Sequence, residues 1–362
     1  MRGDIICIGG TSQWPATIFR GIDQWGEKYG YILVDPIGGA IGAFSHADGI
    51  STGGQARTPI CKMPNIEHTE QDFPVLFLYR KEVPDSGGAG KFRGGLSAES
   101  CFVPHNTPSI TQDTLSSGNA TPTATGMMGG YPGTTNEYKY VRHSDIQDRI
   151  ESRKMIDDIS EVAGESVTLQ LRQVNFEQLP ADVYSVVCSA AGGFGDPLDR
   201  DSQKVKEDVD AYSVTVDGAR KIYGVVIESE TGELDHDATE SLRTNTRNAR
   251  LNGHRLNPIK ANGELLLEVT ENIHLRSEGG RTVYCCAKCH TEIGLLGENY
   301  KEHCIRIDKH VSKSNLLIGE PSRFIDDVPQ FRQFVCPGCG TLIENEIAMK
   351  GEPLLMDIHI EE

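Results

Sequence analysis

The sequence predicts a mainly β protein with glycine-rich, polyproline-II-like segments, a few short helices and a small β module in its C-terminal region. Residues 1–140 place Gly or Pro every few positions between short apolar runs and show almost no helical period. Helical patterning gathers instead in residues 200–253. Two Cys-x-x-Cys pairs mark the tail and indicate a compact module stapled through its cysteines.

The length and charge of the chain limit what it can be. A chain of 362 residues can form two or three domains. Its net charge of −17 is spread along the sequence, which argues against nucleic acid or an anionic membrane as partner. Residues 1–10 show no signal peptide, and the longest apolar runs are too short to cross a bilayer. We therefore expect a cytoplasmic protein with reduced cysteines.

The first part of the chain is expected to fold as short strands and tight turns. The apolar runs Tyr31–Val34 and Phe73–Tyr79 predict strands. Residues 106–135 are rich in Ser, Thr, Gly and Pro, and we expect a long surface loop there. Within it, residues 126–130 have so little side-chain bulk that they could approach a ligand or a neighbouring chain, with a plain flexible loop as an equal alternative.

Helices are expected only after this part. Apolar residues at helical spacing between Asp199 and Gly224 predict two short helices with a charged face. Asp237 and Glu240 resemble a capping box, which opens a helix that ends near Gly253. Residues 265–269 and 282–284 then read as strands. We place a boundary near residue 262, which gives domains 1–262 and 263–362.

The cysteine pairs Cys286/Cys289 and Cys336/Cys339 have the spacing of a metal site, since two Cys-x-x-Cys turns can close a tetrahedral shell of four thiolates around zinc. A redox pair or buried free thiols are the alternative. A four-cysteine shell leaves no open position, so the predicted zinc is structural and the β module resembles a zinc ribbon. Because these four cysteines already fill the shell, we do not expect the nearby side chains to be ligands: Cys285, His290, His303 and Cys304. The span between the pairs, with Lys301 and Lys309, is expected to be solvated.

Two glycine clusters stand apart from regular structure. Residues 85–95 and 191–198 are too rich in glycine for a helix or a strand. We expect their glycines to adopt positive φ or to lie in tight backbone contact, in particular Gly87, Gly88, Gly192 and Gly193.

These clusters, at this separation and with Tyr223–Val226 following, resemble the C-terminal half of the hydantoinase B family. That family includes large subunits of ATP-dependent hydantoinases, 5-oxoprolinases and acetone and acetophenone carboxylases. The similarity extends to Gly38–Ala43, Asp48–Gly49 and Ile66–Pro74, and so covers about residues 30–250. The tail, with its two cysteine pairs, Asn299–Lys301 and an expected closing strand near residues 353–360, resembles the zinc-binding γ subunit of acetone carboxylase.

The resemblance implies a subunit of an ATP-dependent ketone carboxylase, of the ligase class, that walls the carboxylation chamber and is inactive alone. A hydantoinase A-like partner would bind ATP and activate ketone and bicarbonate, with Mn²⁺ or Mg²⁺ on partner subunits. No Walker-type loop is visible here, which agrees with ATP lying elsewhere. One alternative is a subunit of an ATP-dependent hydantoinase or 5-oxoprolinase, and another is a purely structural assembly subunit. The sequence leaves the substrate and the subunit stoichiometry open.

The resemblance also implies that a separate polypeptide supplies the N-terminal half of a hydantoinase B subunit, because several hundred residues that precede the matching segment in that family have no counterpart here. We therefore expect the first strands to lack partners within the chain. The apolar side chains expected to face that polypeptide are Trp14, Ile18, Phe19 and Trp25.

Catalytic residues are not identified by the sequence. His46 and Asp48, two positions apart in a matched glycine-rich motif, could form an acid–base pair or bind a metal. A turn in which Asp48 bonds its own backbone ahead of Gly49 is the favoured alternative. Asp85 and Asp196, each before a Gly or Pro turn, are likewise expected to form turns.

Overall fold

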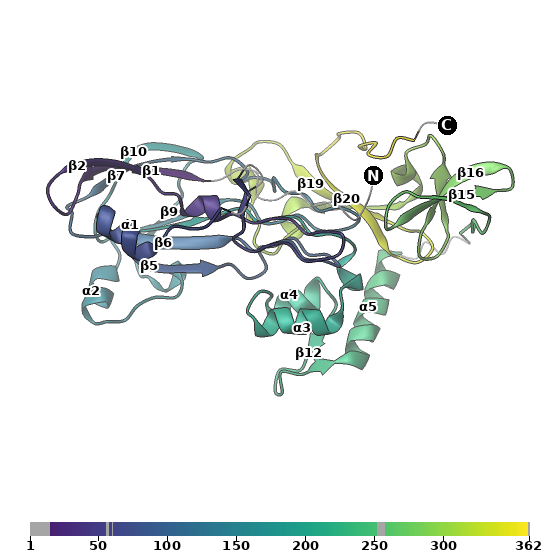
Figure 1. The fold of residues 1–362 in the computed structure, drawn as a ribbon, viewed down its shortest axis with the longest axis horizontal. Helices are drawn as coiled ribbons and strands as arrows, with labels where there is room; N and C mark the ends of the chain where they lie inside the picture. Colours follow the sequence, from purple (N-terminus) through teal and green to yellow (C-terminus); the bar gives the residue numbers. More distant parts are fainter. Residues whose placement is uncertain (1–14, 56–57, 60, 252–257, 361–362) are drawn as a thin grey trace.

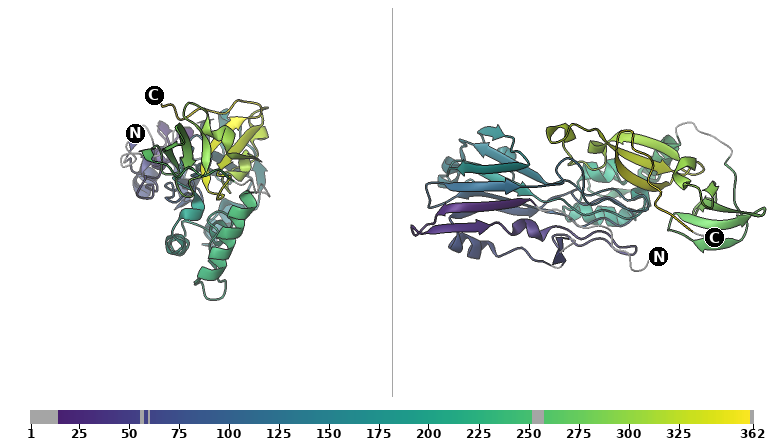
Figure 2. Two further views of the ribbon diagram at one scale, coloured as in Figure 1. Left: turned by 90° about the vertical axis from the view of Figure 1, so that its right-hand side faces the viewer. Right: turned by 90° about the horizontal axis from the view of Figure 1, so that it is seen from above.

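The computed structural model describes residues 15–55, 58–59, 61–251 and 258–360 (Figure 1). The molecule is elongated, with a β sandwich at one end, extended segments in the middle and the C-terminal β module at the other end (Figures 1 and 2). It is mostly strands, as predicted. Within the described ranges, each helix is too short or too polar to cross a membrane.

The β sandwich consists of two antiparallel sheets that share one core. Its first sheet has the order β10–β7–β1–β2 and its second β5–β6–β11–β8–β9. The strands of the first are β1 Ala16–Ile22, β2 Lys28–Ile32, β7 Ile110–Leu115 and β10 Arg172–Gln178. Those of the second are β5 Val75–Glu82, β6 Ala98–Pro104, β8 Glu137–Arg142, β9 Glu165–Val167 and β11 Val183–Val187. The strand predicted at Phe73–Tyr79 is present as β5, whereas the one predicted at Tyr31–Val34 overlaps only the end of β2, which begins three residues earlier and stops at Ile32.

Aromatic rings fill the space between these sheets. Phe102 of β6 lies 5.2 Å from Phe19 of β1 and 5.3 Å from Tyr184 of β11, measured between ring centroids. The expectation that Phe19 faces a partner is wrong, since only 1% of it is exposed. β1 is also paired on both sides, with β2 and β7. Ile18 and Trp25 are exposed as expected, and Trp14 lies outside the described residues.

Four extended segments, residues 38–52, 83–97, 124–136 and 188–196, pack side by side beyond the sandwich and form what we call the glycine bundle. Backbone hydrogen bonds join them: Gly88 N–H donates to Ala191 O (2.8 Å), and Gly193 N–H donates to Tyr131 O (3.0 Å). Their backbones approach closely because glycines lack Cβ atoms. These are the extended glycine-rich segments that the sequence predicted.

The expected surface loop over residues 106–135 is wrong. It contains β7, an interior strand of its sheet, and then enters the glycine bundle. Its polar composition concealed this, because Gln112 and Thr114 are at most 1% exposed inside the sandwich, where Gln112 donates to Gln178.

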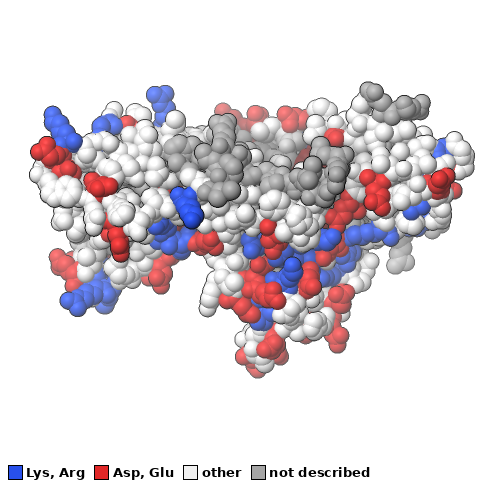
Figure 3. All heavy atoms as spheres, viewed as in Figure 1, with Lys and Arg blue, Asp and Glu red and all other residues white. Residues whose placement is uncertain are grey.

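The helices lie along one side of the molecule. α1 (Ile66–Asp72) and α2 (Ile146–Glu151) flank the sandwich, and α3 (Ser202–Asp210) and α4 (Val216–Lys221) are the predicted pair below the bundle. Charged side chains gather over α3, α4 and the following helix, as expected (Figure 3).

The long helix α5 (His236–Arg250) is capped two residues earlier than predicted. The short hairpin of β12 (Val226–Ile227) and β13 (Leu234–Asp235) leads into it. Because the chain leaves the hairpin at Asp235, that side chain accepts the N–H of Ala238 (2.9 Å), and Asp237 lies within the first turn. The predicted end near Gly253 lies outside the described residues.

The C-terminal module has two sheets. One has the order β14 (Leu265–Glu268), β15 (Ile273–Glu278), β16 (Arg281–Cys286) and β17 (Glu292–Leu295). The other has the order β18 (Ile305–His310), β19 (Pro329–Val335) and β20 (Leu342–Met349). The predicted strands at 265–269 and 282–284 are confirmed. The expected closing strand at 353–360 is wrong, because this described segment runs along the module without ladder pairing.

In the span between the cysteine pairs, Lys309 is exposed as expected, but Lys301 is not. This ammonium is 1% exposed and pairs with Glu346 (3.2 Å) and Asp357 (2.9 Å). It also donates to the carbonyl of Leu355 (3.0 Å), so a buried charge ties the tail to β20.

The module and the glycine bundle share a core. Phe331, Val335 and Leu342 of the module pack in one cluster with Tyr131 of the bundle and Val205 of α3. Asn345 adds polar contacts, donating to the carbonyls of Gly129 and Gly130 at 3.0 Å each. The proposed boundary near residue 262 stays a prediction, and packing across it is extensive.

Candidate metal centre

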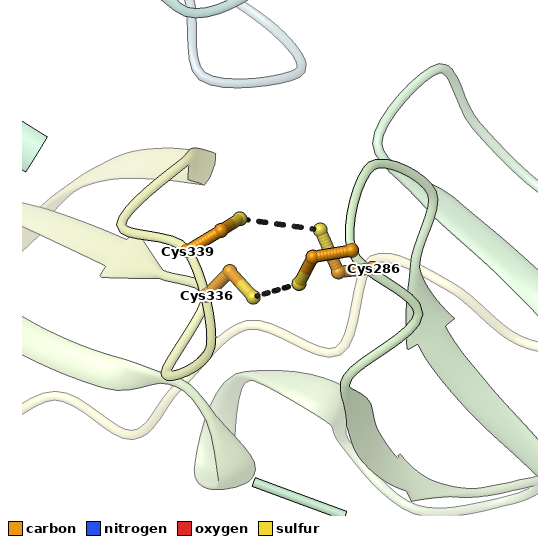
Figure 4. A group of neighbouring side chains, drawn as sticks. Cys286, Cys336 and Cys339 are labelled. Atoms are coloured by element: carbon orange, nitrogen blue, oxygen red, sulfur yellow. Dashed lines mark hydrogen bonds between the residues drawn. The ribbon is translucent and has the colours of Figure 1, made fainter. Parts of the chain in front are cut away.

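Four thiols converge between the two sheets of the C-terminal module. Cys286 ends β16 and Cys289 follows in its turn, while Cys336 and Cys339 lie in the turn between β19 and β20. Their Sγ atoms all lie within 4.8 Å of one another, and Figure 4 shows the labelled thiols pointing into a common space. The structure thus brings together all four residues that the sequence selected.

The distances suit a tetrahedral metal. Sγ of Cys286 lies 3.8 Å from Sγ of Cys339, and Sγ of Cys289 lies 3.5 Å from Sγ of Cys336. A zinc–sulfur bond of about 2.3 Å implies a sulfur–sulfur edge of about 3.8 Å in a tetrahedron, whereas a disulfide needs about 2.05 Å. The cluster therefore fits a structural metal site.

The two turns are built alike. In each, the residue after the second cysteine is left-handed: His290 has φ 58° and Gly340 has φ 73°. A threonine hydroxyl then lies close to the second sulfur, Thr291 at 3.1 Å and Thr341 at 3.3 Å. The sequence pattern Cys-x-x-Cys-x-Thr thus encodes the same turn twice.

Mutual hydrogen bonding also perturbs the thiols. The Cys286 thiol, by hydrogen bonding, lowers the pKa of both Cys289 and Cys339. Thr291 and Thr341 lower these pKa values further. Thiolate is the form that binds metal, so these contacts favour the ligand state at two of the four positions. Within the described residues this is the one group of at least three His, Cys, Asp or Glu side chains close enough for a metal.

A buried ion pair connects the turn of Cys336 and Cys339 to the glycine bundle. Asp196 is 1% exposed, accepts from Arg250 of α5 (2.6 Å) and accepts the N–H of Leu342 (3.0 Å). Arg250 also donates to the carbonyl of Gly340 (3.2 Å). Burial alone raises the pKa of Asp196, but the Arg250 charge and the hydrogen bonds that Asp196 accepts together outweigh it, and the pKa is lowered. Asp196 also accepts the N–H of Leu198 (3.1 Å), so it forms a turn as expected and joins two regions besides.

Asp48 and His46 do not form a pair. Instead, Asp48 accepts the N–H of Arg93 (2.7 Å) and both terminal nitrogens of Arg200 (2.6 and 2.8 Å). Burial alone raises the pKa of Asp48, but Arg200 and Arg93 together outweigh it, and the pKa is lowered. The His46 ring lies 5.9 Å from that of Phe44. Both the acid–base role and the local turn bond are thus replaced by a partly buried ion pair with Arg200.

The predicted glycines lie in tight backbone contact. A Cβ at Gly87 would lie 2.3 Å from the carbonyl oxygen of Gly94, and one at Gly88 would lie 2.1 Å from that of Tyr131. At Gly193 the carbonyl oxygens of Gly88 and Ala89 would be 2.4 Å away. None of these three glycines has positive φ. Close approach, rather than turn geometry, therefore requires glycine here.

Sequence reasoning missed a cleft of about 760 Å³ beside the metal centre, between module and bundle. Glu344 and His274 line it. Neither carries a local motif, because Glu344 sits in an ordinary strand, β20, and His274 in β15. Only the docking of the module onto the bundle places them at one cleft.

Comparison with known proteins matches two parts of the chain. Residues 3–197, more than half of the chain, match the family model described as hydantoinase B/oxoprolinase, and residues 259–361 match that of the acetone carboxylase gamma subunit. The acetophenone carboxylase delta subunit of Aromatoleum aromaticum is 28% identical over 245 residues, covering 65% of this chain and 36% of that subunit. The acetone carboxylase alpha subunit of Xanthobacter autotrophicus is 28% identical over 258 residues, covering 67% and 33%.

Solved structures give the same picture. Nucleotide-free acetone carboxylase superposes with a TM-score of 0.59 at 26% identity, covering 68% of this chain and 34% of that one. The ATP-dependent caprolactamase of Pseudomonas jessenii superposes with a TM-score of 0.52 at 25% identity, covering 66% and 38%. The chain spans about one third of the length of the relatives it matches. Because the family model matches more than half of its residues, the chain belongs to the hydantoinase B/oxoprolinase family.

Proposed function

We propose that this chain is one subunit of an ATP-dependent ketone carboxylase, a ligase-class complex, in which it walls the carboxylation chamber. One observation carries the proposal: a hydantoinase B segment and a gamma-subunit-like module with a four-thiol cluster occur in the same chain. Similarity to subunits named for acetophenone and acetone carboxylases supports it.

In this proposal the metal is zinc, held by Cys286, Cys289, Cys336 and Cys339. Its role is structural, because four protein ligands leave no position for a substrate. The proposed complex works in the cytoplasm, where reducing conditions keep these thiols free.

In this proposal, partner subunits supply the ATP-binding site and the divalent metal. A hydantoinase A-like subunit binds ATP, and Mn²⁺ or Mg²⁺ sits on partner subunits. A separate polypeptide related to the N-terminal half of hydantoinase B remains part of the proposed assembly. ATP is needed because the carbanion beside a ketone carbonyl forms at a very unfavourable pKa, and phosphorylation of the enol removes that barrier from the carboxylation step.

Reconstitution tests the proposal. The chain is coexpressed with the two proposed partners, and ketone loss and ATP hydrolysis are measured with and without bicarbonate, using acetone and acetophenone. We expect ATP turnover that requires both ketone and bicarbonate. The proposal would be contradicted if the assembled complex showed no bicarbonate-dependent ATP turnover with either ketone.

A second candidate is a subunit of an ATP-dependent lactam hydrolase, either a hydantoinase or a 5-oxoprolinase. The likeness to the caprolactamase structure favours it. The same complex is assayed with hydantoin, 5-oxoproline and caprolactam. Lactam opening without any bicarbonate requirement would select this candidate over the carboxylase.

A third candidate is a purely structural assembly subunit. One observation favours this candidate: the carboxylate of Asp48, which the sequence suggests as a catalyst, accepts hydrogen bonds from Arg200 and from the backbone N–H of Arg93. Alanine substitutions that alter assembly but never the rate per assembled complex would select it.

A further inference from the structure

The cleft between bundle and module has the size and the walls of a small-molecule site. Its volume of about 760 Å³ falls within the range of about 300–1,000 Å³ that is common for ligand pockets. Met127, Met128 and Phe194 of the glycine bundle form one apolar wall, and Ile273 and Ile343 of the module form the other. Such walls favour an apolar ligand body.

The acidic lining of the cleft disfavours anionic ligands. Four carboxylates line it, and among the described residues no Lys or Arg is part of the lining. Two of these carboxylates are neutralised from outside, Glu271 by Lys91 and Asp357 by Lys301. Of the remaining acidic groups, Glu268 and the ionised form of Glu344 would repel a carboxylate or a phosphate.

Glu344 is held with its carboxyl group against the bundle. Its two oxygens accept the N–H groups of Met128 (2.9 Å), Gly129 (3.4 Å) and Asn345 (2.9 Å). Met128 and Gly129 are both left-handed, with φ 55° and 90°, which turns successive amides toward one acceptor. Burial raises the pKa of Glu344 to about 7, so near neutrality about half of these groups keep an O–H donor.

His274 contributes a second uncharged polar group. Its Nδ1 is buried without a hydrogen-bond partner in the part of the chain that the structure describes. Burial lowers the pKa of His274, so the imidazole is neutral at pH 7. A buried polar atom without a partner costs free energy unless a ligand or water satisfies it.

We propose that this cleft binds an uncharged ketone, with Glu344 donating a hydrogen bond to the carbonyl oxygen and the apolar walls holding the rest of the molecule. The proposal rests on the proposed function, because it assigns the neutral substrate of that reaction to residues of this chain. The carboxylated product carries a negative charge, and the acidic lining favours its departure.

Titration of the full chain with acetophenone tests this proposal. We expect calorimetric binding at pH 6 and about thirtyfold weaker binding at pH 8.5, because the protonated fraction of a group with a pKa near 7 falls from about 90% to about 3% between these values. Glu344→Gln keeps a donor at every pH, so its binding should not change between the two values. The other titratable groups facing the cleft are Glu268, Glu271, His274, Tyr300, Asp357 and His359. His274→Gln removes the imidazole that also lines the cleft and should leave the pH dependence in place.

A matched pair of variants tests the location. Leu267 lines the cleft, whereas its neighbour Leu266 on the same strand does not, and the two are 47% and 48% exposed. Leu267→Arg should weaken acetophenone at least about tenfold and let benzoate bind, and Leu266→Arg should behave like the wild type.

Three results would overturn the inference: no binding of acetophenone at pH 6, equal effects of the two arginine variants, or tighter binding of the cation 1-phenylethylammonium than of acetophenone. The last would identify an amine site instead. A reconstituted complex that carboxylates ketones while this chain binds none would overturn the inference and leave the proposed function standing.

Discussion

The β sandwich and the C-terminal module are both antiparallel β structures, yet they are stabilised differently. The sandwich core is built from rings such as Phe19, Phe102 and Tyr184, contributed by both of its sheets. The core of the module includes the cysteines themselves, with Cys286 and Cys336 fully buried. The sandwich therefore depends on excluding water from aromatic surface, and in the proposed zinc-bound form the module depends also on the metal that its thiols hold.

Loss of metal should separate the two regions most sharply. Cys286→Ser combined with Cys339→Ser should abolish zinc binding and unfold the module, since zinc contributes on the order of 10 kcal/mol of apparent free energy in small domains. The sandwich should stay folded, because its core cluster takes no residue from the module. Zinc content and limited proteolysis measure this. Cys61→Ser, outside the cluster, is the control, and unchanged zinc content in the double variant would refute the site.

The converse change tests the sandwich. Phe102→Ala removes a ring that is 0% exposed and contacts Phe19, Phe77 and Tyr184, so we expect a loss of about 4 kcal/mol in the free energy of unfolding. Zinc content of the folded fraction should stay at the wild-type level. A parallel loss of zinc would show that the two regions unfold as one unit.

The joint between the regions should respond to pH. Asp196→Asn leaves the buried Arg250 without its counter-charge and should cost about 3 kcal/mol. Because the folded pKa of Asp196 is lowered, its contribution is complete above the unfolded value of about 3.9 and is lost as the pH falls through the folded value. Acid denaturation of the wild type should contain this loss. A variant with wild-type stability at pH 7 would contradict it.

A single methyl group in the glycine bundle should have the smallest effect of the four. Gly88→Ala places a Cβ 2.1 Å from the carbonyl oxygen of Tyr131, and parting these backbones should cost about 2 kcal/mol. Gly30→Ala is the matched control, because its nearest neighbour would be 3.9 Å away. Thermal unfolding compares the two, and equal melting temperatures would count against tight packing of the bundle.

Features with a local signature were predictable. The cysteine turns, the glycine clusters and the helical pair α3–α4 are each written in a few adjacent residues, and the structure contains them all. Features that depend on distant partners were not. Asp196 meets Arg250 across 54 positions, and Lys301 meets Glu346 across 45. No local sequence pattern identifies the distant partner of an Asp or a Lys. The sequence therefore predicts only a turn at Asp196 and a solvated side chain at Lys301.

The strand β7 shows a further limit of sequence patterns. Its Thr111, Gln112 and Thr114 lack the apolar alternation of a half-buried strand. Interior position in the sheet and a bond from Gln112 to Gln178 compensate for this polarity. Composition alone therefore suggested a loop.

The distance between the two cysteine turns has a consequence for synthesis of the chain. Cys286 and Cys339 are 53 positions apart, so a ribosome releases the first turn well before the second. Domains generally fold from the N-terminal end during translation, and the sandwich and bundle precede both turns. A nascent chain then waits with half a chelate, and the full one forms only after residue 339 emerges. In the proposed zinc-bound form, full coordination of the metal therefore requires translation past residue 339.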